Sequence, residues 1–133
     1  SLRCNETLQL LTLTRNQLDA EGCKALAPGI AAVKKLQKLR INYSARMGVE
    51  GVEYLMNAVA SNLKLQEFHF GDNELETEGW LIVCKVLENH PGIQHLDLSW
   101  ALSESVTGAA AEACGAALAQ VLRRNQVLEA LLL

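Results

Sequence analysis

Apolar and polar positions recur along the chain with a long and nearly constant period. The pattern LxxLxL, in which Ile or Phe can replace Leu, occurs five times. Its middle apolar residues are separated by 28, 29, 28 and 35 positions and are Leu11, Leu39, Phe68, Leu96 and Leu131. The alternation within each copy is typical of a short strand with one buried face. A period of this length indicates stacked structural repeats.

A helical pattern follows each of the first three copies. Gly22, Gly51 and Gly79 are each followed, four and eight positions later, by apolar residues such as Leu26 and Ile30. This spacing places the apolar side chains on one face of a helix. The sequence therefore predicts strands near residues 10–13, 38–41, 67–70, 95–98 and 130–133, and helices near 20–34, 49–61, 77–89 and 107–124.

The connections determine how these elements assemble. A return of about 15 residues that contains a helix forces successive strands to lie parallel, because a parallel pair needs a long crossover. One strand and one helix cannot bury their apolar faces alone, so neighbouring repeats must complete the core. The expected fold is α/β, a solenoid whose curved parallel sheet of short strands lines the concave face and whose helices cover the convex face.

The stretches LQLLTLTRNQLDAEGCKAL and LQEFHFGDNELETEGWLIV resemble the ribonuclease-inhibitor-like class of leucine-rich repeat. The strand motif, the loop asparagines Asn16 and Asn73, the leucines two residues later and the helix-opening glycines all fall in register. The resemblance covers the whole chain and implies a horseshoe segment that binds partners. It implies no particular chemistry, because members of the class share a binding mode rather than a reaction.

Two repeats depart from this pattern. Ser44 and Ala101 stand where the loop asparagine is expected, and we predict that Ser replaces its hydrogen bonds in part whereas Ala does not. The fourth repeat also carries a seven-residue insertion in the segment SWALSESVTGAAAEACG. We expect its Ser and Thr residues to cap a helix that the insertion lengthens.

Composition narrows the class of protein further. Half of the residues are apolar but only 5% are aromatic, which predicts an aliphatic core and excludes intrinsic disorder. The net charge of -3, with mixed signs and no basic cluster, argues against nucleic acid as a partner. No apolar stretch reaches the length of a membrane span, and no signal-peptide pattern follows Ser1.

The four cysteines, Cys4, Cys23, Cys84 and Cys114, form no CxxC pair and have no His at ligand spacing. We predict reduced thiols, no metal site, no cofactor and a cytoplasmic, intracellular location. The start LRCNETLQLLTL aligns with the end LRRNQVLEALLL. We expect one leucine-rich-repeat domain over 1–133, with about four to four and a half repeats, cut from a longer array and open to self-association through its uncapped ends.

The candidate binding residues lie on the concave side of the expected sheet. Side chains between the inward-facing leucines form rows across neighbouring strands, and we expect lateral contacts within each row. Aromatic residues follow two of these strands, at positions typical of binding hot spots. The candidate partner-binding residues are Lys38, Arg40, Tyr43, Glu67, His69, His95, Asp97 and Trp100. The rows are explained about as well by solvated charges that have no binding role. Trp100 can likewise cover the inserted turn instead of binding a partner.

No catalytic residues are predicted. Asp97 and Ser99 stand two apart on one strand and lack the strand-to-helix turn that presents a nucleophile, so His69 completes no hydrolase triad. The leading hypothesis is a non-enzymatic protein-interaction module that binds through the concave sheet and the loops after its strands. The alternatives implied by the resemblance are a regulator of a GTPase, similar to the Ran GTPase-activating protein, and the ligand-sensing region of a NOD-like receptor.

Overall fold

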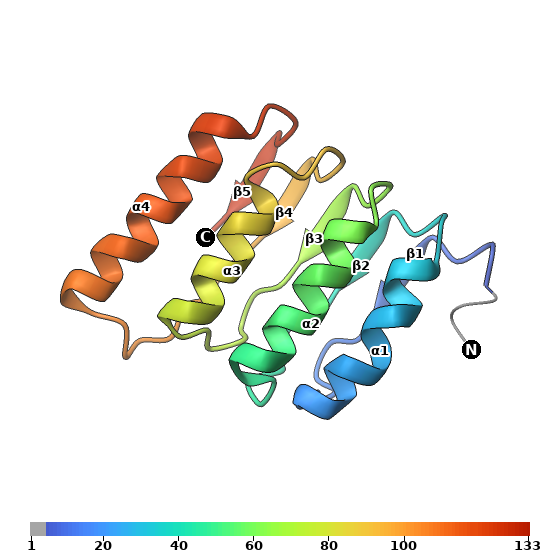
Figure 1. The fold of residues 1–133 in the computed structure, drawn as a ribbon, viewed down its shortest axis with the longest axis horizontal. Helices are drawn as coiled ribbons and strands as arrows, with labels where there is room; N and C mark the ends of the chain where they lie inside the picture. The colour runs from blue at the N-terminus through green and yellow to red at the C-terminus, as the bar shows by residue number, and fades with distance from the viewer. Residues whose placement is uncertain (1–4) are drawn as a thin grey trace.

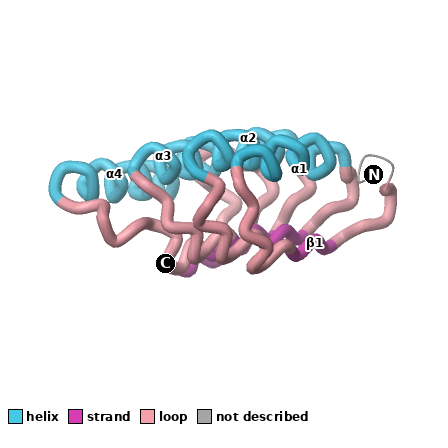
Figure 2. The backbone as a smooth tube through the Cα atoms, turned by 90° about the horizontal axis from the view of Figure 1, so that it is seen from below, coloured by secondary structure: helices cyan, strands magenta, loops and turns pink. Residues whose placement is uncertain are grey.

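Strands and helices alternate along the chain and form two layers. A computed structural model describes residues 5–133. Within them, one parallel sheet has the strand order β1-β2-β3-β4-β5. The helices lie side by side against one face of this sheet (Figures 1 and 2). The elements are β1 (Leu10–Thr12), α1 (Ala20–Ala32), β2 (Lys38–Arg40), α2 (Gly48–Ser61), β3 (Glu67–His69), α3 (Thr77–Leu87), β4 (His95–Asp97), α4 (Gly108–Arg124) and β5 (Ala130–Leu132).

The predicted elements and their parallel arrangement are confirmed. Every expected strand and helix is present, with ends within about two residues of the predicted ones. Leu11 pairs with Leu39, Leu39 with Phe68, Phe68 with Leu96 and Leu96 with Leu131. The middle residue of each strand therefore points toward the helices, and its two neighbours point to the opposite face.

The core lies between the sheet and the helices and is mostly aliphatic. Leu39, Phe68 and Leu55 are completely buried. Phe68 stacks on Phe70 with ring centroids 5.3 Å apart. Trp80 packs between α3 and α4, where its indole Nε1–H donates to the carbonyl of Cys114 at 3.1 Å. The indole is thus almost fully buried without an unpaired donor.

The insertion in the fourth repeat lengthens α4 to 17 residues, against 11 to 14 in the other helices. Thr107 occupies the N-cap, but its side chain makes no capping hydrogen bond, so the predicted capping is wrong at this position. Ser105 instead donates to the Glu76 carboxylate at 3.0 Å, which ties the inserted loop to the start of α3. A parallel bridge between Leu75 and Leu102 strengthens the same contact.

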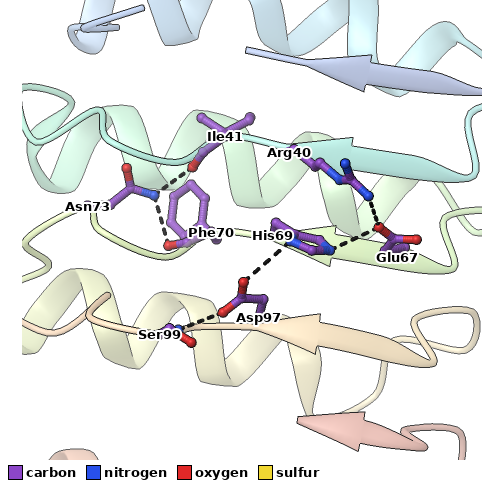
Figure 3. Close-up of polar contacts among 8 residues, drawn as sticks. All are labelled: Arg40, Ile41, Glu67, His69, Phe70, Asn73, Asp97 and Ser99. Atoms are coloured by element: carbon purple, nitrogen blue, oxygen red, sulfur yellow. Dashed lines mark hydrogen bonds and ion pairs between the residues drawn. The ribbon is translucent and has the colours of Figure 1, made fainter. Parts of the chain in front are cut away.

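A buried asparagine holds the loops that follow the strands. The Asn73 amide donates to the carbonyls of Ile41 and Phe70, both at 2.8 Å (Figure 3). Its oxygen accepts from the N–H of Ser44 at 2.9 Å. Asn73 therefore links its own repeat to the preceding one. The Ser44 hydroxyl is buried without a hydrogen-bond partner, so the prediction that Ser44 replaces the asparagine in part is wrong.

A second set of polar side chains holds the opposite ends of the repeats, between each helix and the next strand. Asn62, His90 and Asn125 each bond to a carbonyl near the end of the helix of the preceding repeat. Asn125 and His90 also accept from the backbone N–H groups two and three residues later. Sequence reasoning missed this ladder. The sequence signal for these hydrogen bonds is a polar residue three positions before each strand motif. The second repeat lacks it, because Val33 stands at this position.

Cys23, Cys84 and Cys114 are buried free thiols, and Cys4 lies outside the described residues. Over residues 5–133, no helix has the length and apolar character needed to cross a membrane.

Candidate functional site

The predicted rows of side chains are present on the concave face of the sheet. Lys38, Glu67 and His95 occupy one register row across β2, β3 and β4. Arg40, His69 and Asp97 occupy the next row. The buried middle residues of the strands fix these positions, because side chains alternate between the two faces of a strand.

Glu67 is the centre of the charged network and joins the two rows. Its Oε2 lies 2.8 Å from Lys38 Nζ. Its Oε1 lies 2.6 Å from Arg40 Nη2 and 2.9 Å from His69 Nε2 (Figure 3). Hydrogen bonds from Lys38 and then Arg40 lower the pKa of the Glu67 carboxyl from 4.5 to about 2. Glu67 is therefore a permanent anion at neutral pH, clamped between two cationic side chains.

His69 extends the network to the next strand. Its Nδ1 lies 3.4 Å from Asp97 Oδ2, while Asp97 Oδ1 accepts from the backbone N–H of Ser99 at 2.9 Å (Figure 3). Both ring nitrogens of His69 thus face carboxylates, Nε2 that of Glu67 and Nδ1 that of Asp97. The network spans β2, β3 and β4 and fixes the orientation of side chains that remain partly exposed.

The structure confirms part of the expected lateral contacts and adds a diagonal one. Lys38 contacts Glu67 and His69 contacts Asp97 within their rows, whereas Arg40 reaches diagonally to Glu67. Glu67 directs its oxygens to Lys38, Arg40 and His69, and His95 lies exposed beside this group in the register. Backbone pattern predicts the rows, but the side-chain conformations select the partners.

The two aromatic candidates lie at the ends of the strands. Tyr43 follows β2 and Trp100 follows β4, and their side chains are 47% and 76% exposed. Trp100 lines one hollow with Leu102, Ser103 and Glu104 of the inserted segment, so binding and covering the inserted turn both stay predictions for it. Arg15 and Asp72 occupy the same position in the repeats that contain β1 and β3. All four residues have positive φ, between 54° and 62°.

The polar side chains of this face form ion pairs and hydrogen bonds with one another. Asp97 contacts the backbone of Ser99, and no triad geometry results. Burial raises the pKa of Cys23 to about 11 and that of Cys84 to about 12, so these thiols are protonated and poor nucleophiles at neutral pH. Among residues 5–133, no cluster of three or more His, Cys, Asp or Glu side chains is arranged to hold a metal ion.

Comparisons with known proteins agree with this architecture. The family model described as "Leucine Rich repeat" matches residues 4–27. Mouse ribonuclease inhibitor (Mus musculus) is 33% identical over 104 residues, which are 77% of this chain and 22% of the inhibitor. Human NACHT, LRR and PYD domains-containing protein 13 (Homo sapiens) is 29% identical over 96 residues, or 71% of this chain and 9% of that protein. The chain thus spans less than a quarter of the length of either relative.

A solved structure shows the same fold. The chain of "Leiomodin-1 Actin-Binding Site 2" superposes with a TM-score of 0.80 over 98% of this chain and 73% of that chain, at 10% sequence identity. At this identity the likeness concerns the fold alone. The matched repeat model, the relatives and the parallel repeats of the structure together lead to one conclusion. The chain belongs to the leucine-rich-repeat proteins and is of the ribonuclease-inhibitor-like class.

Proposed function

We propose that this chain is a non-enzymatic module that binds a partner protein through the concave face of its sheet and the loops that follow the strands. The contact surface consists of Lys38, Arg40, Tyr43, Glu67, His69, His95, Asp97 and Trp100. We further propose that residues 1–133 act as one leucine-rich-repeat unit in a reducing, intracellular compartment, which the free buried thiols support.

The ordered charge network carries this proposal. Glu67 is engaged by three side chains from β2 and β3, although the core beneath the sheet is complete without it. Fixing charged side chains before binding lowers the entropy lost on binding, and patterned charges select partners of complementary pattern. The relatives support the same class of function, since one is named an inhibitor of ribonuclease and the structural neighbour an actin-binding site.

A photocrosslinking experiment tests which face binds. A photoreactive residue is placed at His95 on the concave face or, as a matched control, at the exposed Lys85 of α3 on the opposite face. We expect a discrete crosslinked protein from the His95 position and none from the Lys85 position.

A charge-reversal variant provides the second arm. Arg40→Glu with Asp97→Lys and Trp100→Ala should abolish the crosslink from His95 while the circular dichroism spectrum stays unchanged. Crosslinking from Lys85 alone, or a crosslink unaffected by the triple variant, would show that the concave face is not the binding surface.

The similarity to the human NACHT, LRR and PYD protein favours a second candidate, a ligand-sensing region within a NOD-like receptor. The sequence of the parent gene tests it, because such a receptor carries a nucleotide-binding domain with a P-loop upstream of the repeats. The GTPase-regulator alternative stays a prediction from the resemblance.

A further inference from the structure

A hollow of about 500 Å³ lies between the two exposed aromatic residues at the ends of β2 and β4. We call it the rim cleft. It is lined by Tyr43, Asp72, Glu74, Trp100, Leu102, Ser103 and Glu104. These residues contribute two aromatic rings and three carboxylates, and no Lys or Arg stands among them. The rim cleft therefore combines exposed aromatic surface with net negative charge.

The side chains along this edge of the sheet form a row that already contains one cation on an aromatic ring. In strand order, the row reads Arg15, Tyr43, Asp72 and Trp100. The guanidinium carbon of Arg15 lies 4.9 Å from the centre of the Tyr43 ring. Arg15 belongs to the repeat before Tyr43, and the rim cleft opens on the side of the repeats that follow, where Asp72 and Trp100 stand.

The backbone holds these side chains at the edge of the cleft. Tyr43, Asp72, Glu74 and Trp100 all adopt positive φ, between 51° and 59°. The Asp72 N–H donates to the carbonyl of Ser99 at 2.9 Å, which fixes the two neighbouring loops relative to each other. The Trp100 loop is thus bonded to the loop of Asp72, and the Tyr43 loop is bonded to Asn73 through the N–H of Ser44. Each aromatic ring is nevertheless about half exposed or more.

The chemistry of this lining selects a planar cation. Aromatic rings attract cations to their faces, and carboxylates form paired hydrogen bonds with guanidinium. An arginine side chain satisfies both requirements at once, because its planar group stacks on a ring while its N–H groups reach carboxylates in the ring plane. A lysine ammonium is a compact, strongly hydrated charge and gains less from stacking.

We propose that the rim cleft binds an arginine side chain of the partner protein, with the guanidinium against Trp100 and paired with Asp72 and Glu104. This inference rests on the proposed function, since it names the chemistry of the partner at one point of the same surface. The charge network around Glu67 lies on the strands themselves, whereas the rim cleft lies in the loops that follow them.

The probe for this site is N-acetyl-arginine amide, and its neutral counterpart is N-acetyl-citrulline amide at matched ionic strength. A single side chain binds weakly, with Kd on the order of millimolar. The readout is the indole Nε1–H resonance of Trp100 in NMR spectra of the full chain. Trp80 is the internal reference, because its indole is buried and bonded to Cys114. We expect a saturable shift of the Trp100 resonance with the arginine probe alone.

Variants of the lining carboxylates test whether these groups bind the arginine probe. Asp72→Asn with Glu104→Gln should weaken binding of the arginine probe about fivefold or more. The matched control, Glu21→Gln with Glu112→Gln, removes two exposed carboxylates from α1 and α4 and should leave binding unchanged. An unshifted Trp80 resonance in each variant reports that the fold is retained.

Two results would overturn the inference. One is an equal shift of Trp100 with the arginine and citrulline probes, and the other is equal affinity in the cleft variant and its control. Neither result touches the proposed function, which is tested by crosslinking from His95. If a partner crosslinks to the His95 position but the rim cleft does not bind guanidinium, this inference is rejected and the proposed binding function still stands.

Discussion

Replacing Asn73 by Ala tests whether the loop asparagine is a principal support of the solenoid. The side chain is only 2% exposed. Its truncation leaves the carbonyls of Ile41 and Phe70 and the N–H of Ser44 without the hydrogen bonds that they now form. Each lost bond costs about 1 kcal/mol, and a buried group left unpaired raises this cost. We therefore expect Asn73→Ala to lower the free energy of unfolding by about 3–5 kcal/mol.

The chain supplies a matched control for this substitution. Asn16 occupies the same position in the first repeat, but it is exposed and makes one long contact, 3.5 Å from its Nδ2 to the carbonyl of Thr14. Asn16→Ala should change the free energy of unfolding by less than about 0.5 kcal/mol. Guanidinium denaturation followed by circular dichroism measures both variants, with the m-value checked for constancy. Equal losses in the two variants, or a loss below about 1 kcal/mol for Asn73→Ala, would refute the reasoning.

Four further variants test other parts of the structure by the same denaturation assay. Burial lowers the pKa of His90, and its neutral ring accepts hydrogen bonds from backbone N–H groups. The contribution of His90 to stability is therefore complete above about pH 6.5 and is lost as the pH falls. His90→Asn should reduce the difference in the free energy of unfolding between pH 7.5 and pH 5.5. Gly71→Ala should lower the free energy of unfolding by about 2–3 kcal/mol, because a Cβ there would lie 2.4 Å from the carbonyl oxygen of Ser99. Gly115→Ala in α4 is the control: its Cβ meets no atom within 4 Å, and the substitution should stabilise the chain by up to about 1 kcal/mol. Glu67→Gln should cost about 1–2 kcal/mol at low salt and less at 1 M salt, and a loss unaffected by salt would contradict the electrostatic role of Glu67.

The fold could be predicted from the sequence because two independent periods agree. The spacing of Leu11, Leu39, Phe68 and Leu96 fixes the repeat, and the alternation within each strand fixes which side chains face the concave surface. A shift of the register by one residue would turn the buried leucines outward, so one register is strongly favoured. The rows of candidate residues followed from this argument alone.

The partners within the candidate site could not be predicted in the same way. Both carboxylate oxygens of Glu67 accept hydrogen bonds, and long cationic side chains lie within reach on the neighbouring strand. Several ion pairs are therefore compatible with the same backbone. The structure selects the diagonal contact with Arg40 as well as the lateral contact with Lys38. The hydrogen bonds of Asn62 and His90 were not predicted for another reason. The two side chains differ in chemistry, and they share only their position before the strand motif.

The position of the buried groups implies that stability and binding are separable in this chain. The middle residue of β2, Leu39, is fully buried, while the flanking Lys38 and Arg40 keep 49% and 39% of their side chains exposed. Core packing and the Asn73 hydrogen bonds hold the repeats together from the helix side and the loops. The concave face contributes ion pairs between partly exposed groups, which are worth less to stability than the buried core and the Asn73 hydrogen bonds. Changes there can therefore alter the charge pattern offered to a partner without unfolding the sheet that displays it.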